Sequence, residues 1–96
     1  MYVLITYDVA DTATDGAGRL RRVAKLCTQY GQRVQFSVFE CLLEPAQFEQ
    51  LKHDLLDVID IERDSIRFYN LGSNWKRRVE HFGAKEGYDP QGFLMV

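Results

Sequence analysis

Residues 1–8 read Met1-Tyr-Val-Leu-Ile-Thr-Tyr-Asp8, an apolar run that ends in a carboxylate. Val3, Leu4 and Ile5 are apolar, two of them β-branched, and this composition predicts a strand. A continuous apolar run needs cover on both faces, so we expect a central strand of a sheet. Asp8 then stands where the strand meets a polar loop over residues 10–18. A charge in that place is either a cap of the following turn or a functional group.

The next residues predict a helix and then a long strand. An apolar stripe at helical spacing runs along residues 17–30 and comprises Leu20, Val23, Ala24, Cys27 and Tyr30. We expect Gly31 to end this helix in the left-handed conformation. Residues 33–43 predict a strand that is bent or bulged near Ser37, because apolar side chains point to both faces beyond that residue.

A second helix and one or two further strands follow. Pro45 suits the first turn of a helix that we expect to end near Ile59. Its predicted buried face comprises Phe48, Leu51, Leu55, Val58 and Ile59. Residues 64–71 predict a strand, whereas residues 75–82 fit a short helix and an edge strand equally well.

This order of elements predicts an α+β fold. If the long strand counts as two, or pairs with the C-terminal segment, the chain forms a ferredoxin-like βαββαβ sheet with both helices on one face. The other face then needs cover, and a second copy of the chain would provide it. We therefore expect a homodimer of one domain, residues 1–96, with residues 1–72 as its core. Residues 73–96, which end in the apolar Phe93-Leu-Met-Val96, would be the dimerisation segment that packs on the partner sheet.

The distribution of charge indicates a polyanionic partner. The net charge is only −2, yet residues 17–39 contain five basic side chains and no acidic one, and Lys76, Arg77 and Arg78 form a second basic cluster. Residues 40–64 contain eight acidic side chains against the two basic residues Lys52 and Arg63. One basic face on an acidic protein suggests nucleic acid, although two solvated helix faces of opposite sign would give the same pattern.

Composition excludes several other classes of protein. No apolar run is long enough to span a bilayer, and the N-terminus lacks the basic residues of a signal peptide, so we expect a cytoplasmic protein. Two cysteines are too few for a disulfide scaffold or a zinc site and are expected to be reduced core thiols.

Carboxylates are the remaining candidates for chemistry, because the sequence has no glycine-rich phosphate loop, HExxH or CxxC motif. Magnesium is commonly held by one or two carboxylates with waters and substrate phosphates. Asp8 alone would be half of such a site, and a two-fold dimer would supply the other half. On the residues alone, a capping or turn role for Asp8 is still favoured.

Three stretches resemble the small CRISPR-associated nuclease family of the spacer-acquisition machinery. They are Tyr2-Val-Leu-Ile-Thr-Tyr-Asp8, Arg19-Leu-Arg-Arg-Val-Ala-Lys25 and Gly31-Gln-Arg-Val-Gln-Phe-Ser-Val-Phe-Glu40. The resemblance implies a ferredoxin-like homodimer that exchanges a C-terminal strand, with Asp8 as the magnesium ligand contributed once per subunit. The matching basic, polar and aromatic positions around the same cleft are Arg19, Arg22, Arg33, Ser37 and Phe39.

The leading hypothesis is therefore a Mg²⁺- or Mn²⁺-dependent endonuclease that cuts RNA or double-stranded DNA in CRISPR spacer acquisition and antiviral defence. Asp8 would be its catalytic metal ligand. The predicted nucleic-acid-binding residues are Arg19, Arg22, Arg33, Ser37, Lys76, Arg77 and Arg78. The alternatives are a non-catalytic DNA-binding scaffold for the CRISPR integrase subunit, a small regulatory domain that binds a metabolite, and a toxin-like ribonuclease of the same fold.

Overall fold

The computed structural model describes residues 1–71 and 79–84. Its elements follow in the order β1 (Tyr2–Asp8), α1 (Gly16–Tyr30), β2 (Gly31–Gln35), β3 (Val38–Leu42), α2 (Pro45–Val58), β4 (Ser65–Asn70) and β5 (Val79–Gly83). None of the helices in this part of the chain is long and apolar enough to cross a membrane.

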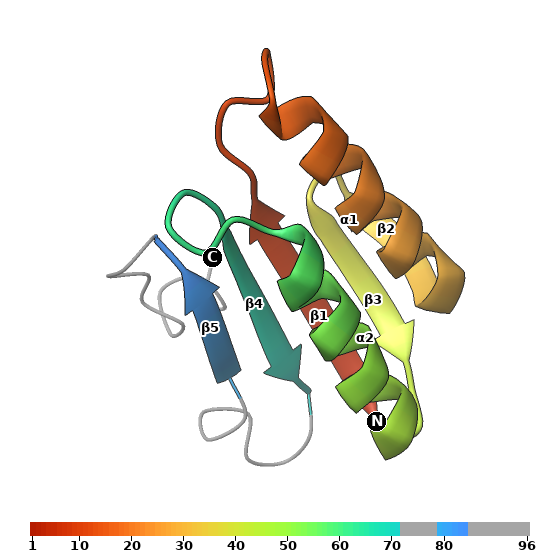
Figure 1. The fold of residues 1–96 in the computed structure, drawn as a ribbon. Helices are drawn as coiled ribbons and strands as arrows, with labels where there is room; N and C mark the ends of the chain where they lie inside the picture. The colour runs from red at the N-terminus through yellow and green to blue at the C-terminus, as the bar shows by residue number, and fades with distance from the viewer. Residues whose placement is uncertain (72–78, 85–96) are drawn as a thin grey trace.

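The strands form one antiparallel sheet in the order β2-β3-β1-β4-β5, and both helices lie against the same face of it (Figure 1). β1 is in the centre, paired with β3 on one side and β4 on the other. The central strand that the apolar run predicted is therefore confirmed. The predicted α+β, ferredoxin-like arrangement is confirmed, with β5 added at one edge.

The core lies between the sheet and the two helices. Side chains alternate along β1, so Val3, Ile5 and Tyr7 are buried beneath the helices. The helices contribute Val23 and Cys27 from α1 and Phe48, Leu51 and Leu55 from α2. Each such large apolar side chain stabilises the fold by roughly 1.5–3 kcal/mol when it is fully buried.

The predicted long strand over residues 33–43 is a hairpin. β2 and β3 are joined by the two residues Phe36 and Ser37, and their register shifts between Arg33 and Gln35. The expected interruption near Ser37 is confirmed, and it gives the two strands that the ferredoxin-like order requires. A bulge of this kind increases the local twist and re-aims the side chains next to it.

Gly31 does not end α1 in the left-handed conformation, so that prediction was wrong. Its φ of −157° is extended backbone, and it is the first residue of β2. Glycine is needed here because the hairpin packs tightly. A Cβ at Gly31 would lie 2.2 Å from the carbonyl oxygen of Glu40 and 2.5 Å from the Sγ of Cys41.

The ambiguous stretch over residues 75–82 is resolved only in part. Val79–Gly83 is a strand that pairs with β4, which confirms the edge-strand alternative for those residues. Residues 72–78 and 85–96 lie outside the described residues. The predicted dimerisation segment over residues 73–96 falls mostly within them.

Candidate functional site

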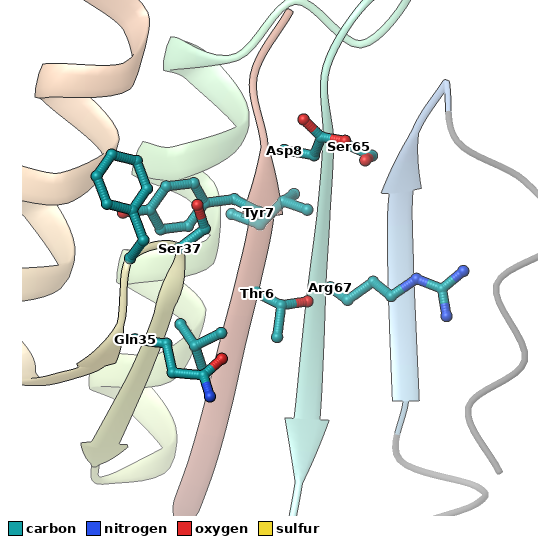
Figure 2. A pocket seen from close by; sticks show the side chains of 10 residues that line it. Thr6, Tyr7, Asp8, Gln35, Ser37, Ser65 and Arg67 are labelled. Atoms are coloured by element: carbon teal, nitrogen blue, oxygen red, sulfur yellow. The ribbon is translucent and has the colours of Figure 1, made fainter. Parts of the chain in front are cut away.

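Asp8 is the last residue of β1 and lies directly opposite Ser65, the first residue of β4. Its side chain is exposed and points to the sheet face away from the helices, because it alternates with the buried Tyr7. Figure 2 shows the Asp8 carboxylate beside the Ser65 hydroxyl where the two strands meet.

An open cavity of about 340 Å³ surrounds this position. It is lined by Thr6, Tyr7, Asp8, Gln35, Phe36, Ser37, Val38, Ser65, Ile66 and Arg67. Three segments distant in sequence therefore meet here: the end of β1, the β2–β3 turn and the start of β4 (Figure 2). Asp8 and Ser37, which the sequence nominated separately, share this cavity.

The β2–β3 turn is held in place by the backbone of β1. The amide of Tyr7 donates a hydrogen bond of 3.1 Å to the carbonyl oxygen of Ser37. Tyr7 immediately precedes Asp8, so this bond joins the turn to the end of β1. It keeps Ser37 in the lining of the cavity that contains Asp8.

Arg67 is a lining residue that the sequence did not nominate. It lies on β4 opposite Thr6 of β1 and His81 of β5, and only 6% of it is exposed. In Figure 2 its side chain extends from β4 toward β5. The available signal was a charged side chain between Ile66 and Phe68 in an apolar strand, on the same face as Ser65. Arg67 therefore lines the cavity with Asp8, while its guanidinium lies toward β5.

Arg19 is placed inside the protein rather than on a nucleic-acid-binding surface. Its Nε donates to Asp64 Oδ2 at 2.8 Å, and its Nη2 donates to the carbonyl oxygen of Ala10 at 3.2 Å. Asp64 is completely buried. Burial alone would raise the pKa of Asp64, but the hydrogen bonds from Arg19 and from the amides of Asp60 and Ala10 outweigh it and lower that pKa. The Arg19 guanidinium is thus engaged with a buried partner.

Arg22 and Arg33 are also absent from the residues that line the cavity. Arg33 lies over the ring of the buried Phe39 at 5.2 Å, and that ring stacks on Tyr7 with centroids 6.1 Å apart. Arg22 is exposed on α1. Lys76, Arg77 and Arg78 fall outside the described residues.

The donor set around Asp8 suits a loosely held divalent cation. Within residues 1–71 and 79–84, no three His, Cys, Asp or Glu side chains are grouped as a metal site. Magnesium, however, retains waters and needs only one or two carboxylates when substrate phosphates complete its shell. Asp8, with the hydroxyl-bearing Ser37 and Ser65 nearby, meets that requirement, and a two-fold copy would add a second carboxylate.

Known proteins match this chain over most of its length. Residues 1–79 match the family model of the CRISPR associated protein Cas2. The "CRISPR-associated endoribonuclease Cas2" of Nitratidesulfovibrio vulgaris is 57% identical over 96 residues, covering 100% of this chain and 94% of the relative. The "CRISPR-associated endonuclease Cas2" of Halalkalibacterium halodurans is 55% identical over 89 residues, which are 93% of each chain.

Solved structures agree with these matches in sequence. The crystal structure of Streptococcus pyogenes Cas2 at pH 6.5 superposes with a TM-score of 0.71 at 61% identity, covering 83% of this chain and 96% of that one. The resemblance drawn from the three sequence stretches is therefore confirmed. The chain belongs to the Cas2 family of CRISPR-associated proteins.

Proposed function

We propose that this protein is an endonuclease of CRISPR spacer acquisition that hydrolyses phosphodiester bonds with Mg²⁺ or Mn²⁺ held by Asp8. The observation that carries the proposal is the exposed Asp8 carboxylate at the end of the central strand, in a cavity lined by hydroxyl groups and a buried arginine. Its relatives support this choice, since one is named an endoribonuclease and another an endonuclease.

Each lining group has a chemical task that suits phosphodiester hydrolysis. Asp8 would hold the cation, which when bound would supply an activated water and neutralise charge on the phosphate. The hydroxyl groups of Ser37 and Ser65, which line the same cavity, can donate hydrogen bonds to phosphate oxygens. The rigid strand ends keep these groups in position.

The active form in this proposal is a homodimer in which residues 73–96 contribute to the interface and two Asp8 carboxylates share one site. Arg22 and the cluster from Lys76 to Arg78 would hold the phosphate backbone of RNA or double-stranded DNA outside the cleft. Such binding is largely independent of sequence and weakens steeply with salt. The protein would act in the cytoplasm beside the CRISPR integrase subunit.

The direct test is cleavage of RNA and of duplex DNA by wild-type protein and by Asp8→Asn, with magnesium and with a chelator. We expect Asp8→Asn to lose about a hundredfold or more of the metal-dependent rate while it still binds substrate. Asp57→Asn is the matched control, because Asp57 is an exposed carboxylate on α2, remote from the cavity. Full activity of Asp8→Asn at saturating magnesium would remove Asp8 from the mechanism.

A DNA-binding scaffold for the integrase is the second candidate. The observation that favours it is that Asp8 is the one carboxylate among the residues lining the described cavity. A dimer that holds its two copies of Asp8 far apart would bind DNA and leave it uncut. Salt-sensitive binding without cleavage, together with spacer acquisition that survives Asp8→Asn, would select this role.

A further inference from the structure

Phe36 is a large aromatic side chain that the proposed chemistry does not use. It is 77% exposed, the highest value among the large apolar side chains of the described residues. Exposure of most of a phenyl ring to water is unfavourable, so the exposed Phe36 indicates a binding role. Phe36 belongs to the β2–β3 turn and lines the same cavity as Asp8.

The turn holds Phe36 at a defined place. Its neighbour Ser37 accepts the 3.1 Å hydrogen bond from Tyr7, and the hairpin pairs Gln35 with Val38 on either side of the turn. The backbone of the turn is therefore held on both sides of Phe36, while the Phe36 side chain itself is exposed. An aromatic platform ordered before binding loses little conformational freedom when a ligand stacks on it.

The ligand that fits is an unpaired nucleobase. We propose that Phe36 stacks on a base of the strand whose phosphate lies at Asp8, so that this site prefers single-stranded nucleic acid. A nucleotide presents a phosphate and a flat aromatic face together. The cavity offers the Ser37 and Ser65 hydroxyl groups to the phosphate and the Phe36 ring to the base. In a duplex the base faces are covered by their neighbours in the stack, which leaves no free face for Phe36. The inference rests on the proposed function, because it assumes that a phosphate occupies the Asp8 site.

Binding without cleavage tests stacking separately from catalysis. In the Asp8→Asn background and without metal, Phe36→Trp places an indole fluorophore in the turn. A single-stranded RNA oligonucleotide should quench its emission, and the same oligonucleotide in a duplex should not. The Asp8→Asn protein alone corrects for Trp75. Equal quenching by single strand and duplex, or no quenching by either, would overturn the proposal even if wild-type protein cuts RNA.

A second measurement assigns the effect to the base. Phe36→Leu keeps an apolar side chain but removes the ring, and it should bind the intact oligonucleotide about tenfold more weakly. An oligonucleotide with an abasic position should bind wild-type protein and Phe36→Leu equally. Ile61→Ser is the matched control, since Ile61 is 58% exposed and is not among the residues that line the cavity.

The competing explanation is that Phe36 packs against a second copy of the chain. In that case Phe36→Leu would lower the sedimentation coefficient of the free protein, and its effect on binding would be the same for intact and abasic oligonucleotides. That pair of results would overturn the proposal.

Discussion

Asp64 connects the candidate site to the rest of the fold. This completely buried carboxylate accepts hydrogen bonds from the Arg19 Nε at 2.8 Å and from the amides of Ala10 and Asp60 at 2.9 Å each. Arg19 also binds the carbonyl oxygen of Ala10, so both backbone polar groups of that residue are engaged. Ala10 follows Asp8 by two positions. The buried ion pair therefore sets where the chain leaves β1.

Replacing Asp64 by asparagine should destabilise the protein by about 3 kcal/mol at pH 7, because it removes the buried carboxylate 2.8 Å from Arg19 and leaves this arginine with the exposed Asp15, 3.7 Å away. Since the pKa of Asp64 is lowered in the folded protein, its stabilising contribution is fully present above the unfolded pKa of about 3.9 and is lost as the pH falls below it. Chemical denaturation from pH 7 to pH 3 should show the difference between wild type and Asp64→Asn shrinking on acidification. A difference that stays constant through this range would contradict the charged ion pair.

The two cysteine thiols should be unreactive in the folded protein. Both are buried and free, and burial raises the pKa of Cys27 to about 12 and that of Cys41 to about 11. At pH 8 almost no thiolate is present to attack a reagent. We expect a chromogenic disulfide to label neither cysteine in native protein and both after unfolding in guanidinium. Fast labelling of the native protein would show that α1 or β3 opens readily.

At the scale of the elements, two glycines in different surroundings should respond in opposite ways to the same substitution. Gly31→Ala places a methyl group against the carbonyl of Glu40 and should destabilise the protein by about 3 kcal/mol through overpacking. Gly18→Ala lies within α1, where the nearest heavy atom to the new Cβ would be 4.0 Å away, and should stabilise by about 0.5–1 kcal/mol through helix propensity. Urea denaturation of both variants measures the contrast. A neutral Gly31→Ala would contradict the tight packing of Gly31 against β3 across the hairpin.

Most elements could be predicted because local patterns determine them. The apolar run of β1 and the stripe that includes Val23 and Cys27 gave both type and place, since burial imposes a period of two on strands and 3.6 on helices. Gly31 was misassigned because a glycine after a helix has two physical causes, a left-handed backbone or a close approach. Only the position of Glu40 across the hairpin separates them.

The candidate site was less predictable than the fold. Asp8 stood out as a charge at the end of an apolar strand, but its assignment as a ligand depended on the family resemblance. Arg19 and Arg22 are both basic residues on the same predicted helix, and local pattern could not tell them apart. What distinguishes them is the partner of Arg19, Asp64, which is 45 positions away in sequence. Arg67 was overlooked because its role depends on strand pairing with β1.

At the scale of the whole molecule, the sheet face away from the helices carries exposed apolar side chains among the described residues. Tyr2 of β1 is paired with Leu42 of β3 at one end of this face, and they are 43% and 76% exposed. Asp8, the last residue of the central strand β1, lies at the other end of this face. A second copy packed on this face would bury apolar surface and, around a two-fold axis, bring a second Asp8 toward the first. Stability and catalysis would then depend on the same association.

Mixed dimers test whether the two Asp8 carboxylates act together. Wild-type protein and Asp8→Asn, carrying different tags, would be unfolded together in equal amounts and refolded, with native mass spectrometry to verify that the hybrids form. If each site needs both carboxylates, only the dimers with two wild-type chains cut, which is about a quarter of the total, so the rate should fall to about 25% of that of wild type. The control is the same mixture combined after separate refolding, before exchange, which should retain about half of the rate. If the refolded mixture also retains about half of the wild-type rate, each Asp8 works alone. The metal site would then lie entirely within one subunit.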